Sequence, residues 1–189
     1  MKLPKSFYTR DTLTVAQELL GKVLVYKNFK VRISETEAYI GAIDKAAHCY
    51  GNKKTKRTET MFKEGGYAYV YMIYGMYYCI NIVTGLLGEG SAILIRSAAP
   101  LSNADEMFVN RYNISREIAN KYQIKNLTNG PGKLCKALNI TKNENGLSLT
   151  SENMYLEDDG FNVNQIHKGK RINIDYAEEA KDFEWRFFI

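Results

Sequence analysis

Three runs of aromatic and β-branched residues, close together in the chain, constrain its fold more than any other feature. They are YAYVYMIY at 67–74, YCINIV at 78–83 and SAILIR at 91–96. Residues of these types favour strands because their side chains pack well on a pleated, half-buried surface. The runs are joined by Gly75 and by LLGEG at 86–90, which are connections of hairpin length. We therefore predict an antiparallel meander.

A second pair of alternating runs extends the predicted sheet. KVLVY at 22–26 and KVRISETE at 30–37 flank a short polar turn around Asn28, as in a hairpin. Thr14 and Gln17 fit a capping box at the start of a short helix. We expect that helix to end at Gly21. The remaining expected elements are helices over 102–112 and 134–138 and weaker strands near 147–157 and 171–176. The predicted fold class is α+β, a curved, mainly antiparallel sheet flanked by helices.

Composition indicates a globular protein. A chain of 189 residues that is 45% hydrophobic and 25% charged can bury a sizeable core, and no repeat or Pro/Gly-rich linker divides it. We therefore expect residues 1–189 to form a single domain. No apolar leader or membrane-length apolar run is present, which predicts a cytoplasmic protein without a membrane partner.

The cysteines and histidines give little basis for metal or disulfide chemistry. Cys49, Cys79 and Cys135 are far apart and form no C-x-x-C pattern, so neither a disulfide framework nor a zinc site is expected. His48 and His167 are too few to assemble a metal cluster, and no cofactor is predicted. The formal net charge of +5 favours an anionic partner.

Two glutamates stand at the end of an otherwise apolar strand face. With a period of two, Val31, Ile33, Glu35 and Glu37 are expected to project from the same face. A buried carboxylate is costly unless it is paired, and burial raises its pKa. An ion pair with a lysine or arginine explains such residues, and so does a functional site, where local rules are often broken.

Polar residues and a basic loop follow this strand. Tyr39 and His48 are expected on a loop and a short helix. Either residue alone would usually be structural, but together with the nearby glutamates they indicate a candidate site. The segment NKKTKRTET then holds four cations, which suit either a solvated loop or phosphate binding. These cations are Lys53, Lys54, Lys56 and Arg57.

The tyrosines of 67–74 divide between the two faces of the predicted strand. Tyr67, Tyr69 and Tyr71 share one face, whereas the other face is small and apolar, with Ala68, Val70, Met72 and Tyr74. Tyr74 stands beside Gly75, where a ring would protrude from the turn. A face of rings with polar tips can stack on a planar base and donate hydrogen bonds. A tyrosine-rich surface or a protein interface would show the same pattern.

Several longer motifs resemble the alkyladenine (3-methyladenine) DNA glycosylase family, which is distinct from the helix-hairpin-helix glycosylases. SETEAYIG, AAH, MF, YVYMIYGMYYCIN, LIR and NGPGKLCKAL occur in the family's order, and the likeness runs from about residue 19 to the RFFI end. The resemblance implies a monofunctional base-excision repair enzyme. Its partner would be double-stranded DNA containing damaged purines, which it would bind as a monomer, associated with the nucleoid.

The resemblance also implies a role for each matching position. Glu37 corresponds to the general base that activates water, and Arg96 to the arginine that helps hold that water and the glutamate. The other matches concern DNA binding: Tyr39, His48 and Tyr71 hold the flipped base, Asn81 excludes the amino group of guanine, Tyr74 fills the gap left in the duplex, and Met76 and Tyr77 contact the neighbouring minor groove. The cations at 53–57 depart from the family's pattern, and their charge alone predicts contact with the DNA backbone.

The implied reaction is hydrolytic removal of alkylated or deaminated purines. The implied substrates are 3-methyladenine, 7-methylguanine, hypoxanthine and ethenoadenine, without metal or cofactor. No lysine in these motifs stands out as a Schiff-base nucleophile, so strand cleavage is not predicted. Two other functions stay open at this point: a non-catalytic module that binds damaged DNA, and a different hydrolase that uses Glu35 and Glu37 as a carboxylate pair.

Overall fold

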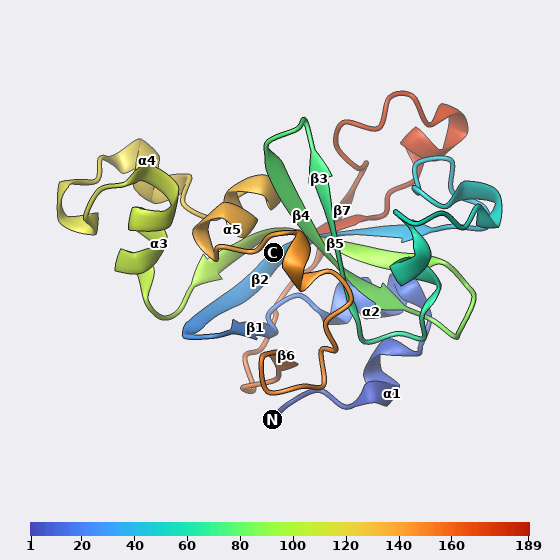
Figure 1. Ribbon diagram of the computed structural model, residues 1–189, viewed down its shortest axis with the longest axis horizontal. Coiled ribbons are helices and arrows are strands. Elements are labelled where there is room, and N and C mark those ends of the chain that lie inside the picture. The colour runs from blue at the N-terminus through green and yellow to red at the C-terminus, as the bar shows by residue number, and fades with distance from the viewer.

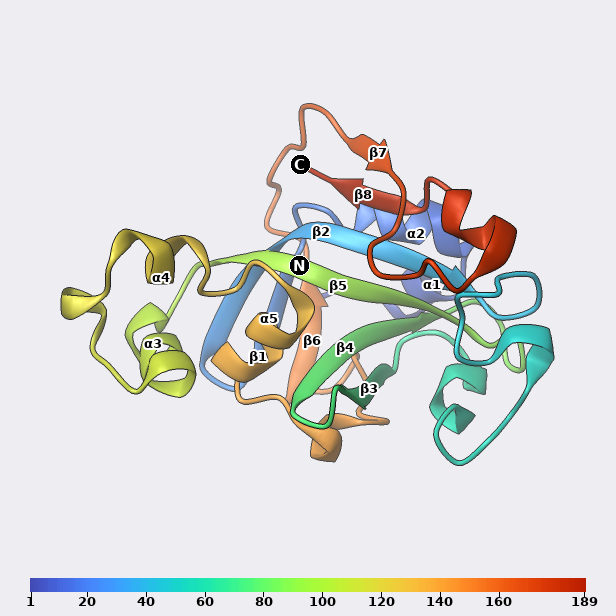
Figure 2. The same ribbon diagram turned by 90° about the horizontal axis from the view of Figure 1, so that it is seen from above.

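A computed structural model describes residues 1–189 and shows a twisted antiparallel sheet of eight strands (Figures 1 and 2). Six strands are in the order β3-β4-β5-β2-β1-β6, and β8 pairs with both β2 and β7. The strands are β1 (Val23–Tyr26), β2 (Phe29–Ile40), β3 (Ala68–Ile73), β4 (Tyr77–Thr84), β5 (Ser91–Pro100), β6 (Met154–Glu157), β7 (His167–Gly169) and β8 (Arg186–Phe188).

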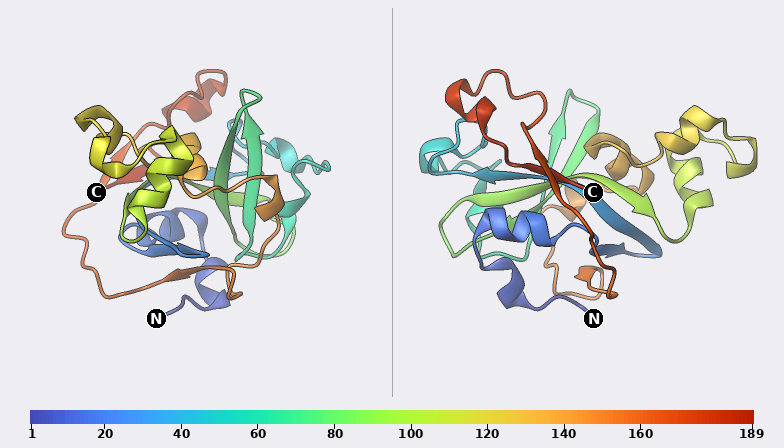
Figure 3. Two further views of the ribbon diagram at one scale, coloured as in Figure 1. Left: turned by 60° about the vertical axis from the view of Figure 1, so that its left-hand side comes forward. Right: turned by 180° about the vertical axis from the view of Figure 1, so that it is seen from behind.

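Five α-helices surround the sheet. They are α1 (Lys5–Tyr8), α2 (Thr12–Glu18), α3 (Ala104–Tyr112), α4 (Lys121–Lys125) and α5 (Pro131–Ala137). Helix α2 packs against β2 and α5 against β4, whereas α3 and α4 project beside the sheet as a lobe (Figure 3). No helix is both long and apolar enough to cross a membrane.

The α+β class, the meander and the 22–37 hairpin are confirmed, and some local predictions are wrong. Helix α2 is capped by Asp11, whose side chain accepts a hydrogen bond from the Thr14 N–H, so the predicted capping box at Thr14 does not start it. The expected strand at 171–176 is an irregular segment. Strands β7 and β8, which no local pattern predicted, extend the sheet. Helix α4 likewise has no counterpart among the predicted elements.

A β-bulge at Ser34 changes which face of β2 is buried. Ile33 pairs with Ala98 and Glu35 with Ser97, so Ser34 is an extra residue in β2. The core-facing residues therefore shift from Val31 and Ile33 to Thr36 and Ala38. The prediction that both glutamates continue the apolar face is wrong, because the extra residue moves Glu35 and Glu37 to the opposite face.

The two faces of the meander have different surroundings. One face contributes Ala68, Val70, Ile80 and Ile93 to a core cluster of 31 buried residues. On the other face, Tyr69 belongs to a separate cluster of seven buried residues, against which Tyr67 and Tyr71 pack. The predicted division of tyrosines and small apolar residues along β3 is thus confirmed, and the tyrosine face borders a cavity.

Candidate active site

A cavity of about 800 Å³ lies on the tyrosine face of the sheet. Its floor is a row of cross-strand neighbours, because Tyr69 of β3 pairs with Asn81 of β4, Asn81 with Leu94 of β5, and Leu94 with Glu37 of β2. All four side chains line the cavity. Three hydrogen-bonded strand pairs therefore set the spacing between the polar groups of the floor.

Glu37 is the buried acid at one end of this row. Its side chain is fully buried, and each carboxylate oxygen accepts one hydrogen bond: Oε1 from the Ile172 N–H at 2.8 Å and Oε2 from the Tyr39 hydroxyl at 2.7 Å. Arg96 Nη1 lies 3.4 Å from Oε1. Burial raises the pKa of the carboxyl, against the opposing effect of Arg96. A carboxylate held in this way keeps lone pairs free for a water molecule.

Arg96 reaches both glutamates because it lies at an irregularity of β5. Glu35 pairs with Ser97 and Thr36 with Ile95, which leaves Arg96 as an extra residue between them. Its Nε donates to Glu35 Oε1 at 3.2 Å, and the same oxygen accepts from Arg186 at 3.0 Å. The ion-pair explanation is therefore confirmed for Glu35, and the two carboxylates have different environments.

Aromatic rings form the walls around Glu37. Tyr39, predicted on a loop, lies in β2, and His48, predicted on a short helix, lies in a turn. The His48 and Tyr71 rings meet edge to face with centroids 4.4 Å apart. His48 Nδ1 is hydrogen-bonded to the Tyr69 hydroxyl at 3.0 Å. Burial, with the nearby Arg57 charge, lowers the pKa of His48 to about 4, so the imidazole is neutral at pH 7.

Asn81 is held in place by the strand beside it. Only 4% of its surface is exposed, and its Nδ2 donates to the Tyr69 backbone carbonyl at 3.0 Å. One amide hydrogen is thereby used, and the side chain is fixed at the cavity floor. Such an amide can discriminate between ligands, because a ligand that leaves its remaining donor or acceptor without a hydrogen-bond partner binds less well.

Tyr74 stands at the tip of the β3–β4 hairpin, beside the mouth of the cavity. Ile73 pairs with Tyr77, and the Met76 N–H bonds to the Ile73 carbonyl. Tyr74 and Gly75 both have positive φ, 53° and 67°, as in a type I′ turn. Tyr74 is 71% exposed and Met76 67%. The conformation is unfavourable for tyrosine, so this exposed ring is not explained by folding preference.

The predicted basic segment lies near the cavity but does not form its lining. Lys53, Lys54, Lys56 and Arg57 are all exposed, and none of them forms an ion pair with an acidic side chain. Arg57 comes nearest, with its guanidinium 5.6 Å from the centroid of the Tyr71 ring. The segment therefore places free positive charge beside the aromatic wall.

The segment that follows β7 contains site residues that the sequence did not reveal. Arg171 is buried and bonds both oxygens of Asp44, at 2.5 and 2.8 Å. Its guanidinium also lies 4.7 Å from the centroid of the Tyr39 ring, and the next residue, Ile172, supplies the N–H that Glu37 accepts. No local pattern marks Arg171, because its partner is 127 residues away.

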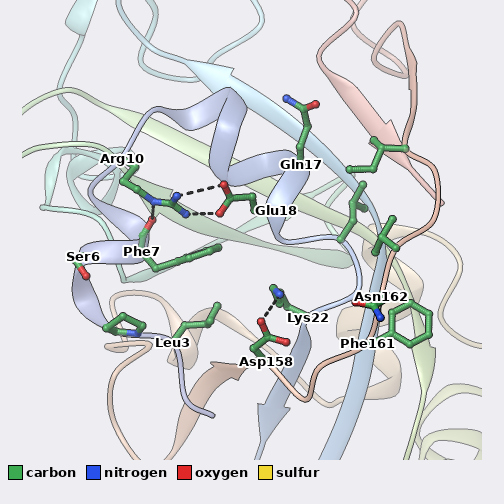
Figure 4. A pocket seen from close by; sticks show the side chains of 14 residues that line it. Leu3, Ser6, Phe7, Arg10, Gln17, Glu18, Lys22, Asp158, Phe161 and Asn162 are labelled. Atoms are coloured by element: carbon green, nitrogen blue, oxygen red, sulfur yellow. Dashed lines mark hydrogen bonds and ion pairs between the residues drawn. The ribbon is translucent and has the colours of Figure 1, made fainter.

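A second cavity, of about 640 Å³, lies between the N-terminal helices and the segment after β6 (Figure 4). Its charged groups neutralise one another: Arg10 binds both oxygens of Glu18, and Lys22 pairs with Asp158. This cavity therefore offers a ligand no unpaired charge. The Glu37 cavity combines a buried acid with walls of aromatic rings, and the unpaired cations of 53–57 lie beside it, so it is the candidate active site.

Comparison with known proteins gives a consistent result along the whole chain. The sequence profile of the methylpurine-DNA glycosylase (MPG) family matches residues 6–189. A protein of Alkaliphilus oremlandii is 55% identical, and the aligned residues cover 100% of this chain and 96% of that protein. A protein of Clostridium novyi is 53% identical, with 100% and 94% covered. Both carry the name "Putative 3-methyladenine DNA glycosylase".

Proposed function

This chain belongs to the methylpurine-DNA glycosylase family, and from that premise we propose that it removes damaged purines from double-stranded DNA by hydrolysis. The substrates we propose are 3-methyladenine, 7-methylguanine, hypoxanthine and ethenoadenine. The observation that carries the proposal is Glu37, a buried carboxylate with one donor on each oxygen, facing a cavity walled by aromatic rings.

The cavity suits a base that has left the double helix. A target atom inside a duplex is out of reach, so the nucleotide is rotated outward at a cost of a few kcal/mol. Stacking on rings such as Tyr39 and Tyr71 offsets this cost by roughly 1–3 kcal/mol per base. Purines alkylated at N3 or N7 are cationic, which adds attraction to the ring faces. Because His48 is neutral, it does not repel such a base.

Glu37 then acts on water. In the proposed step, its ionised carboxylate takes a proton from a water whose oxygen bonds to the anomeric carbon of the sugar. The bond from that carbon to the base nitrogen breaks, and its electron pair leaves with the base. A purine alkylated at N3 or N7 thereby becomes neutral, whereas a neutral purine such as hypoxanthine must take up a proton as it leaves. The carboxylate also stabilises the positive charge that develops on the sugar. Arg96, 3.4 Å from Oε1, helps keep Glu37 ionised despite its burial.

The direct test is single-turnover reaction with enzyme in excess over lesion-containing duplex. We expect release of free base without strand cleavage, measured separately for 3-methyladenine, 7-methylguanine, hypoxanthine and 1,N6-ethenoadenine. The relative rates would rank the substrates. Binding of lesion duplex without release of any base would contradict the proposal and favour a non-catalytic damage-binding module.

The pH dependence of excision should report Glu37. Only the ionised carboxylate can accept the proton, and burial raises its pKa. For a cationic 7-methylguanine lesion, we therefore expect the single-turnover rate to rise with pH, with its midpoint above the ordinary glutamate pKa. A flat profile from pH 5 to 8, measured with that lesion, would indicate that no proton acceptor limits the step.

Tyr74 should show a conflict between stability and DNA binding. Asparagine tolerates positive φ and favours type I′ turns, so Tyr74→Asn should raise the free energy of unfolding by about 0.5–1 kcal/mol. If the ring fills the gap left by the flipped nucleotide, the same variant should bind lesion duplex more weakly. Urea unfolding and fluorescence anisotropy measure the two effects. Tyr77→Asn, in a regular strand, is the control that should not gain stability.

A further inference from the structure

Basic side chains without an acidic partner are concentrated in two parts of the chain. Eleven of the 26 lysines and arginines form ion pairs. Of the fifteen that do not, ten lie in residues 53–57 and 111–136. Charge left unpaired in this way is available to an anionic partner. The first segment adjoins the Glu37 cavity, whereas the second spans the lobe formed by α3 and α4 together with the adjoining helix α5.

The β3–β4 hairpin stands between these two basic segments (Figures 1 and 3). On one side lie the turns after β2, which lead into residues 53–57, and the segment after β7. On the other side lies the helical lobe. The cavity extends along both sides of the hairpin, since its lining includes Glu37 on one side, Tyr74 and Tyr77 of the hairpin, and Tyr122 and Lys133 on the other side. A ligand that occupies the whole cavity therefore meets the hairpin near its middle.

Within the lobe, some cations hold the structure together. Lys133 Nζ donates to the side-chain oxygens of Asn126 and Asn129, at 2.6 and 3.0 Å. Arg111 donates to the Tyr112 hydroxyl and the Asn126 carbonyl. Burial lowers the pKa of Lys133, and the nearby Arg111 charge adds to this effect. These two residues thus fix the loop that carries α4.

Helix α4 presents the groups that remain free. Lys121, Tyr122 and Lys125 are exposed, Tyr122 by 71%, and their side chains form no hydrogen bond or ion pair. A capping box between Asn120 and Gln123 holds the helix start, with both hydrogen bonds at 2.9 Å. Two ammonium groups beside a flat exposed ring match the chemistry of a sugar–phosphate backbone.

We propose that Lys121, Tyr122 and Lys125 of α4 bind the complementary strand of the duplex, opposite the strand whose nucleotide enters the Glu37 cavity. This inference rests on the proposed function. A flipped nucleotide moves toward the Glu37 end of the cavity, on one side of the hairpin, and the hairpin tip takes its place in the stack. The intact strand then lies on the other side of the hairpin, which is where α4 lies.

The test compares double-stranded and single-stranded DNA of one sequence. The variant Lys121→Ala/Tyr122→Ala/Lys125→Ala changes only exposed side chains, and equal thermal unfolding would confirm its fold. We expect its affinity for undamaged duplex, measured by anisotropy, to fall about 10-fold, with a salt dependence reduced by about 2 in slope. Affinity for the single strand should not change. Single-turnover excision from duplex by the variant should need a higher enzyme concentration to reach its maximal rate than the wild type does.

Lys142→Ala/Lys168→Ala is the matched control, because it removes the same charge from exposed, unpaired lysines outside both segments. Equal loss of single-strand and duplex affinity in the α4 variant, or a loss no greater than in this control, would overturn the proposal. Binding of undamaged DNA does not require catalysis, so the affinity comparison tests the role of α4 even if the wild type releases no base. Absence of base release would instead contradict the proposed function.

Discussion

Glu37→Gln is expected to remove base excision while lesion binding and the fold persist. Glutamine has nearly the shape of glutamate and can still accept the Ile172 N–H, but it cannot take a proton from water. We expect the single-turnover rate to fall by at least about 100-fold, the usual lower range for loss of a general base. Anisotropy with lesion duplex should give an affinity close to that of the wild type.

The stability of the same variant shows whether lost activity comes from lost chemistry. Burial raises the pKa of Glu37, so the folded protein favours the uncharged carboxyl. The stabilisation from this preference is present below the ordinary glutamate pKa and is lost as pH rises through the raised pKa. At pH 7, the free energy of unfolding of the Glu37→Gln variant should therefore be equal to that of the wild type or higher. A marked loss of stability would contradict this account of the site.

Glu35→Gln is the matched control, because Glu35 lies two residues away on the same strand. Its carboxylate is partly exposed and bonds to Arg96 and Arg186. We expect a modest fall in excision, less than about 10-fold, through a less firmly held Arg96. Equal losses at Glu35 and Glu37 would instead favour a pair of carboxylates that act together.

Arg171→Met is expected to cause the largest loss of stability. The substitution leaves Asp44 buried without its cation, and breaking such a pair from one side costs about 3–5 kcal/mol. It also removes the hydrogen bonds to the Ala38 and Ala180 carbonyls. Urea unfolding measures the change. Excision at low temperature, where the variant stays folded, should also fall, because the Ile172 N–H would no longer be held toward Glu37.

Lys170→Met provides the comparison from the neighbouring position. Lys170 pairs with Asp182, and both side chains are more than half exposed. Water and salt screen such a pair, so the free energy of unfolding should barely change. Similar losses for Lys170→Met and Arg171→Met would show that the segment tolerates no substitution, rather than that the buried pair holds it.

Much of the sheet followed from local pattern. Alternation in 67–83 placed Tyr69 and Tyr71 on one face of β3 and Ala68 and Val70 on the other, because side chains of a strand point alternately to its two faces. The same rule failed beyond Ser34. A bulge depends on the pairing of β2 with β5, whose residues lie some sixty positions further along the chain, so the alternation of β2 alone carries no sign of it.

The sequence by itself determined which residues form the strands, which turn carries Tyr74, and which family the motifs resemble, since each of these depends on short stretches of chain. Only the tertiary structure decided the surroundings of Glu37. Its donors come from Tyr39 on the same strand and from Ile172, 135 residues away, and its pKa depends on burial by elements from across the chain. Burial and long-range hydrogen bonds exist only once the chain has folded, and for that reason the chemistry of the site could not be read from local pattern alone.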